Sequence, residues 1–181
     1  MATWTLDKDH TSIQFKAKHL MITTVTGKFG EYEANVENDS NDFENASISF
    51  TAKTASISTG NTQRDDHLKS DDFFNAETYP DLTFKADGLT KLSESEFKMD
   101  GEMTIRDVTK PVSLKVEFAG IAKDPWGNTK AGFTFNGKLN RKDFGLKFHV
   151  VNEAGNLLVS DEIKLEGEVQ LLKAVTEEAT A

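Results

Sequence analysis

The 181-residue sequence predicts an all-β fold, an extended eight-stranded antiparallel β-barrel with a short helical lid between strands three and four. Three observations predict it. Apolar and polar residues alternate along eight segments, turn residues separate the segments, and one polar stretch interrupts the alternation. Strict alternation is typical of strands with one dry and one wet face. Eight such strands suit a closed barrel, whose interior is either filled or wide enough for one small ligand.

The inward-facing residues define the expected strands. Their ranges are 13–17, 32–36, 46–52, 82–86, 97–105, 114–120, 131–139 and 163–171. Every range places Ala or Gly on the dry face, for example Ala52 and Gly167. A filled barrel needs bulk at such positions, so we infer a lumen that is partly open. The last range spans about 27 Å at the usual rise per residue of a strand, which suits a long flexible hydrocarbon.

The alternation stops between Ser58 and Pro80, where polar residues crowd together. Asn61 and Ser70 are each suited to cap a short helix. We expect this stretch, called the lid below, to cover one mouth of the barrel. The sequence shows no linker, so we expect a single domain over residues 1–173 and a frayed tail over residues 174–181.

Composition excludes several kinds of site and partner. The chain has no cysteine, which excludes disulfides, thiolate metal sites and a cysteine nucleophile. Its net charge of −9 argues against a nucleic-acid partner and against binding to anionic lipid. No apolar run is long enough to span a membrane, so we expect no membrane insertion. The first residues lack the basic stretch and apolar core of a signal peptide, which predicts a cytoplasmic protein.

The four histidines do not predict a metal site. His10, His19, His67 and His149 show no i, i+2 or i, i+4 spacing that would place two ligands on one side of an element. We therefore expect no metal and no cofactor. His19 continues the inward phase of the first strand, so it is either a hydrogen-bonded core histidine or a group that contacts a ligand.

The charged residues of the lid do not form a recognisable catalytic motif. Arg64, Asp65, Asp71 and Asp72 lie close together, but no nucleophile elbow, zinc-protease motif or phosphate-binding loop accompanies them. An ion pair through which Arg64 anchors the lid is favoured over catalysis. We therefore predict no catalytic residue and no enzymatic activity; a hydrolase acting at the lid is the disfavoured alternative.

Several separated blocks resemble the YceI-like family of bacterial lipid-binding proteins, from Trp4 to about Leu172. The blocks are residues 4–7, 10–15, 19, 25–29, 56–61, 64–74, 79–80, 101–112 and 140–145. The most specific is residues 64–74, Arg-Asp-Asp-His-Leu-Lys-Ser-Asp-Asp-Phe-Phe. The resemblance implies a lipocalin-like barrel whose pore holds isoprenoid chains such as quinone tails or polyprenyl phosphates. It implies no established catalytic activity. Family members often carry a secretion signal, so a trimmed sequence would be periplasmic.

Together these arguments predict a non-enzymatic protein that sequesters or transports one polyisoprenoid or similar long amphipathic lipid. The candidate pore-wall residues are Ile13, Phe15, Ala17, Phe50, Ala52, Phe84, Met99, Met103, Val116, Phe118, Phe133, Phe135, Leu165 and Gly167. His19 and Arg64 are candidates for contact with a head group. Two alternatives stay open: a carrier of a fatty acid or fatty amide, and a ligand-free structural or stress-response module. Monomer and homodimer are both possible.

Overall fold

The computed structural model describes residues 2–39, 42–146, 148 and 159–174. Its strands are β1 (Ala2–Leu6), β2 (Ser12–His19), β3 (Thr23–Phe29), β4 (Tyr32–Asp39), β5 (Asp42–Lys53), β6 (Ile57–Ser58), β7 (Asp81–Asp87), β8 (Thr90–Lys91), β9 (Glu96–Ile105), β10 (Val108–Lys123), β11 (Thr129–Asn140) and β12 (Glu162–Lys173). The helix is α1 (Thr62–Lys69), and the short 3₁₀ turns are η1 (Lys8–His10), η2 (Thr54–Ser56) and η3 (Arg141–Phe144). His149 and the tail beyond Ala174 lie outside the described residues.

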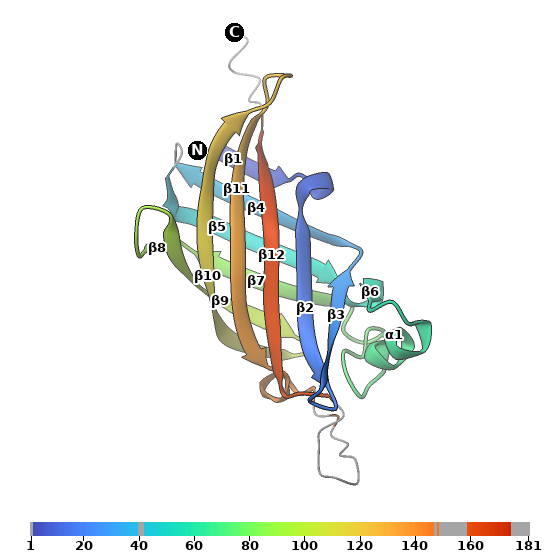
Figure 1. Ribbon diagram of the computed structural model, residues 1–181. Helices are drawn as coiled ribbons and strands as arrows, with labels where there is room; N and C mark the ends of the chain where they lie inside the picture. Colours follow the sequence, from blue (N-terminus) through green and yellow to red (C-terminus); the bar gives the residue numbers. More distant parts are fainter. Residues whose placement is uncertain (1, 40–41, 147, 149–158, 175–181) are drawn as a thin grey trace.

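Eight antiparallel strands close into a barrel (Figure 1). Their order is β1-β4-β5-β7-β9-β10-β11-β12, and β12 pairs back with β1. The predicted all-β barrel with one short helix is therefore confirmed. Seven of the predicted ranges correspond to β4, β5, β7, β9, β10, β11 and β12.

The first strand of the ring differs from the prediction. Trp4 of β1 is paired with Lys173 of β12, while Lys16 of β2 is paired with Lys164 further down the same strand. β1 and β2 thus follow one another along one edge of β12, separated by η1. The ring is closed by β1, not by the predicted range 13–17, because only β1 also pairs with β4. With five residues, β1 is too short for its alternation to stand out.

The lid lies between β5 and β7, as predicted, with α1 beside β6 at the lower end of the barrel in Figure 1. Asn61 caps α1, because its side chain accepts a hydrogen bond from the backbone N–H of Arg64 at 2.9 Å. Ser70 caps the other end of α1, where its backbone N–H donates to the carbonyl oxygen of His67, and the residues after it form turns.

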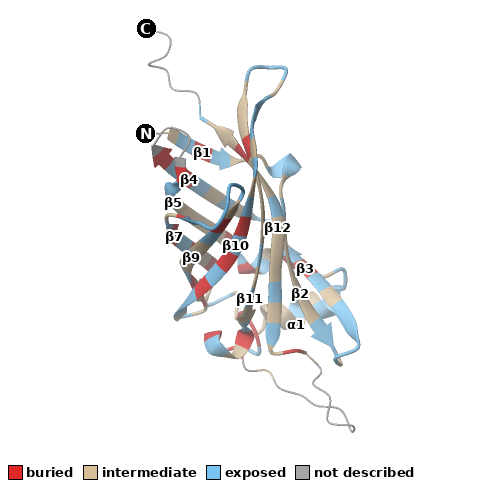
Figure 2. Cartoon of the chain, turned by 60° about the vertical axis from the view of Figure 1, so that its left-hand side comes forward, coloured by how far each residue is buried: buried red, intermediate tan, exposed pale blue. Residues whose placement is uncertain are grey.

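The buried side chains form two clusters, one toward each end of the barrel. The upper cluster surrounds Trp4, whose side chain is fully buried and whose Nε1–H donates to Oδ1 of Asn38 at 2.9 Å. The lower cluster includes Phe73, Phe74 and Leu146, which come from the lid and from the segment after η3. Buried residues recur along β10 in Figure 2, whereas the free end of β2 and β3 is exposed. The core is therefore continuous with the lid.

The inward glycines do not open the lumen in the way their size suggests. A Cβ atom at Gly101 would overlap the ring of Phe84, and one at Gly167 would overlap the ring of Phe135. In both cases a large side chain from the neighbouring strand lies over the glycine. These small residues make room for rings, so the inference from residue size alone is wrong at these positions.

Candidate ligand cavity

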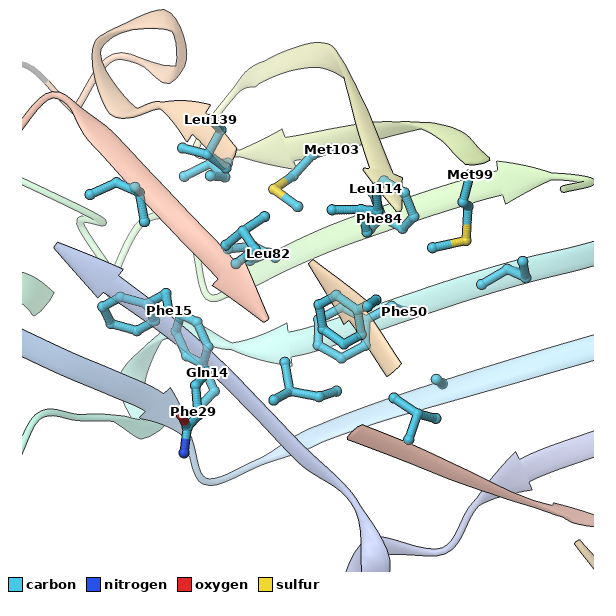
Figure 3. Close-up of a pocket in the computed structure, with 18 of the residues that line it drawn as sticks. Gln14, Phe15, Phe29, Phe50, Leu82, Phe84, Met99, Met103, Leu114 and Leu139 are labelled. Carbon is cyan, nitrogen blue, oxygen red and sulfur yellow. The ribbon is translucent and has the colours of Figure 1, made fainter. Parts of the chain in front are cut away.

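An elongated cavity of about 270 Å³ runs inside the barrel. All eight barrel strands line it, together with β2, β3 and the lid. On β12 the lining extends from Ile163 to Leu171. Side chains from β2, β5, β7, β9, β10 and β11 point toward one another around this space in Figure 3. Among the described residues, the lining is apolar except for Gln14 and Arg141. A dry, elongated space of this kind fits a hydrocarbon chain better than a compact polar molecule.

Most of the predicted pore-wall residues line this cavity. They are Ile13, Phe15, Ala17, Phe50, Phe84, Met99, Met103, Val116, Phe133, Phe135 and Leu165. The alternation placed these side chains correctly because the side chains of a strand alternate strictly between its two faces. Their contact with a ligand stays a prediction.

Three predicted wall residues lie outside the lining. Ala52 is fully buried in the wall. Phe118 stacks on Phe133 with ring centroids 5.0 Å apart, beyond the cavity. A Cβ atom at Gly167 would meet the ring of Phe135 and the backbone oxygen of Ser12. Larger side chains at positions 52 or 167 would therefore strain the wall before they filled the cavity.

Aromatic rings close the upper end of the cavity. The ring of Phe43 lies 5.3 Å from Trp4, 5.8 Å from Phe118 and 5.0 Å from Phe133, measured between centroids. These rings come from β1, β5, β10 and β11, so four strands are joined by one apolar contact cluster. The spacings lie in the favourable range for aromatic pairs. This end is closed by packing.

The lid closes the lower end. Leu68, Phe73 and Phe74 line the cavity from the lid. The ring of His67 packs edge-on against Phe73 at 5.1 Å and against Phe148 at 4.8 Å, and its Nε2 lies 2.9 Å from a carboxylate oxygen of Asp72 outside. His67 therefore supports the apolar residues of the lid and does not itself line the cavity.

Arg64 anchors the lid, although not through the expected ion pair. Its Nε–H and Nη2–H donate to the hydroxyl and the carbonyl oxygen of Thr59, both at 2.7 Å. Thr59 in turn donates its backbone N–H to Asp65 at 2.8 Å. The two charged side chains thus share Thr59, which fixes the start of α1 to the segment before it.

A second arginine, Arg106 in the β9–β10 turn, holds the end of the lid. Its Nη1–H donates to the carbonyl oxygens of Asp71 at 2.8 Å and Phe73 at 3.1 Å. Its Nη2 also lies 2.9 Å from the carboxylate of Asp71. The guanidinium lies 5.4 Å from the ring centre of Tyr79. The planar, five-donor guanidinium makes this multiple contact possible.

The two head-group candidates lie away from the cavity lining. His19 is exposed at the end of β2, where it pairs with Thr23. Arg64 is occupied by Thr59 on the outside of the lid. Their contact with a head group stays a prediction, and the geometry does not add to it.

Arg141 also lines the cavity, although it is not among the predicted wall residues. Its side chain is 2% exposed and donates to the carbonyl oxygens of Ser160 at 2.9 Å, Leu146 at 2.7 Å and Val159 at 3.2 Å. Burial lowers the pKa of Arg141, and the nearby carboxylate of Asp161 opposes that shift. The guanidinium donates its hydrogen bonds to these backbone carbonyls, so Arg141 joins two chain segments at the lower end.

The lining residues outside the predicted wall differ in how far the alternation of the sequence indicated them. Arg141 continues the inward phase of β11 two residues beyond Leu139, so the alternation gave a signal for it, although phase alone does not decide burial at the end of a strand. Leu68, Phe73 and Phe74 had no such signal, because they lie in the lid, where the alternation stops.

The described part of the chain holds no group of three or more His, Asp or Glu side chains suited to a metal ion. No helix in these ranges is long and apolar enough to cross a membrane. In the lid, the carboxylates of Asp65, Asp71 and Asp72 are each hydrogen-bonded to another side chain. These carboxylates therefore help to hold the lid in place.

Comparison with known proteins identifies the family. A sequence profile of the YceI-like domain matches residues 4–171. The chain belongs to the YceI-like family. A UPF0312 protein of Staphylococcus aureus (strain MSSA476) is 36% identical over 171 residues, covering 94% of this chain and 97% of that protein.

Solved structures share the fold. The YCEI protein of Campylobacter jejuni superposes with a TM-score of 0.76 at 39% identity, covering 94% of this chain and 97% of that one. A polyisoprenoid binding domain from Saccharophagus degradans, implicated in plant cell wall breakdown, superposes with a TM-score of 0.70 at 12% identity, covering 94% and 98%. At that identity the second likeness shows the fold alone.

Proposed function

We propose that the barrel binds the hydrocarbon chain of one polyisoprenoid, such as a quinone tail or a polyprenyl phosphate, and sequesters or transports it unchanged. The elongated apolar cavity carries this proposal. Membership of the YceI-like family supports it, as does the shared fold with a polyisoprenoid binding domain. The cytoplasmic placement and the oligomeric state stay predictions.

Burial of the chain supplies the binding free energy. Each five-carbon unit that leaves water gains roughly 4 kcal/mol gross at about 0.8 kcal/mol per CH₂. Ordering the flexible chain and losing its free motion subtract much of this. A polar group along the cavity would lose its hydrogen bonds to water without replacement, because the walls are apolar. We therefore expect the chain inside and the polar head group at one end.

Filling the cavity tests the proposal. Ala34 lines it from β4, beside Phe50, so Ala34→Phe places a ring in the space. We expect at least tenfold weaker binding of a long-chain quinone, measured by quenching of tryptophan fluorescence. Ala119 is exposed on β10 and lies outside the lining, so Ala119→Phe is the matched control and should bind as the wild type does. Equal binding by Ala34→Phe, with an unchanged circular dichroism spectrum, would place the ligand elsewhere.

A further inference from the structure

The β2–β3 hairpin, Ser12–Phe29, has the opposite charge to the rest of the chain. It contains Lys16, Lys18 and Lys28 and no Asp or Glu, whereas the whole chain has 21 Lys and Arg against 30 Asp and Glu. The hairpin thus carries +3 and the remainder −12, which together make the net charge of −9. A basic segment in an acidic protein attracts anionic surfaces locally, and the net charge conceals this.

A row of lysines extends the basic face onto neighbouring strands. Lys138 of β11 is paired in register with Lys164 of β12, and Lys164 with Lys16 of β2. Like charges directly opposite one another destabilise a sheet, so folding stability does not explain the row. Two carboxylates lie beside it: Glu162 is 3.9 Å from Lys138, and Glu166 is 2.5 Å from Lys16. They reduce the positive charge without cancelling it.

The turn at the free end of the hairpin presents apolar side chains to water. Met21 is 51% exposed and Ile22 is 74% exposed. The N–H of Ile22 donates to the carbonyl oxygen of His19 at 3.1 Å, and Leu20 and Met21 have φ angles of 53° and 61°. Turns of this hand favour Asn and Gly. Backbone strain costs stability and exposed apolar side chains add none, so their coincidence indicates a function at this tip.

The tip adjoins the lower end of the cavity. His19 forms a β-bridge with Val159, which lines the cavity. The backbone N–H of Lys18 donates to the hydroxyl of Ser160 at 2.9 Å, and its carbonyl accepts from the N–H of Ser160 at 3.0 Å. Figure 1 shows this end of β2 and β3 at the lower end of the barrel. A surface held by the tip would therefore lie next to the lower end of the cavity.

We propose that the hairpin tip docks the protein on an anionic lipid bilayer, with Met21 and Ile22 entering the interface and the lysines facing the lipid head groups. Apolar burial and charge attraction add together in such contacts. This peripheral contact departs from the expectation drawn from net charge, which averages over the whole chain. It goes beyond the proposed function, because docking does not require an occupied cavity.

Flotation of the full chain with lipid vesicles tests the docking. We expect binding to phosphatidylcholine vesicles that contain phosphatidylglycerol, and weaker binding to phosphatidylcholine alone or at high salt. Replacing both tip residues, by Met21→Asn with Ile22→Ser, should weaken binding at least tenfold, because the buried apolar area is lost. Asn also tolerates the left-handed backbone at position 21. Lys18→Gln should weaken binding about fivefold.

Two matched controls lie elsewhere on the surface. Leu92, 57% exposed, and Lys98 on β9 lie outside the hairpin, so Leu92→Ser and Lys98→Gln should float as the wild type does. The proposal is overturned if the wild type does not float, or if the tip variant floats as Leu92→Ser does. If the wild type does not float but forms a dimer that the tip variant cannot form, the tip contacts a second copy of the chain. That outcome also overturns the proposal. Quinone binding measured on the same variants distinguishes a failure of the docking proposal from a failure of the proposed lipid-binding function.

Discussion

The two ends of the barrel are closed by different interactions. At the upper end, the buried rings of Trp4 and Phe43 pack with the partly buried rings of Phe118 and Phe133, and the four rings come from four strands. At the lower end, the buried rings of Phe73 and Phe74 belong to the lid, which lies outside the barrel strands and is held by hydrogen bonds from Arg64 and Arg106. Water can replace these hydrogen bonds at small net cost, whereas rings that stand on the barrel strands are exposed only at the cost of apolar burial. We therefore expect the upper end to support stability and the lower end to admit the ligand.

The largest expected effect follows from breaking the upper end. Trp4→Ala removes a fully buried indole and leaves Oδ1 of Asn38 without its donor, beside an amide nitrogen that has no partner among the residues that the structure describes. The free energy of unfolding should fall by about 3–5 kcal/mol, measured by urea denaturation. Trp4→Phe keeps a ring and should lose less. A change below about 1 kcal/mol for Trp4→Ala would contradict the role of the upper end.

A smaller effect follows from loosening the lower end. Arg106→Ala removes the donors to the carbonyls of Asp71 and Phe73. The free energy of unfolding should fall by only about 1–2 kcal/mol, because these contacts are partly exposed. Amide hydrogen exchange over residues 62–74 should accelerate, and release of a bound quinone should become faster. Arg106→Lys keeps the positive charge but loses the several N–H donors of the planar guanidinium, so it should reproduce most of the effect of Arg106→Ala. Unchanged exchange in the lid would show that other contacts hold it.

The smallest expected effect concerns pH and the upper end. The hydrogen bond from Lys130 at 2.7 Å lowers the pKa of Asp7 against the opposing effect of burial, and the contact with His10 lowers it further. A lowered folded-state pKa gives stability that is present above the unfolded value and is lost as pH falls through the folded value. Asp7→Asn should therefore reduce the difference in unfolding free energy between neutral and acid pH, by about 1 kcal/mol or less. An identical pH dependence in wild type and variant would remove Asp7 from the account.

The alternation predicted the strands and most of the cavity wall, because burial of one strand face is encoded locally. It did not predict that Phe84 lies over Gly101 or Phe135 over Gly167, because such contacts depend on the register between strands. Register was not readable from any single segment. The position of a residue in the alternation therefore predicted whether it lines the lumen better than the size of its side chain predicted where the lumen is open.

His19 and Arg141 show a second limit. Both continue the inward phase of a strand, but His19 is exposed where β2 ends in a turn, and Arg141 is buried. Backbone carbonyls from another segment surround the guanidinium of Arg141, whereas the turn directs the chain at His19 back into β3. The phase of a residue at a strand end does not predict its burial, because the next element decides it.

Native mass spectrometry of the protein with its co-purified lipid is the decisive measurement of what the barrel binds. We expect one bound molecule whose mass matches a polyisoprenoid, and we expect its loss from Ala34→Phe but not from Ala119→Phe. A fatty acid or fatty amide mass would contradict the ligand class. Protein that never carries lipid and does not take up an added long-chain quinone would contradict a lipid-binding barrel.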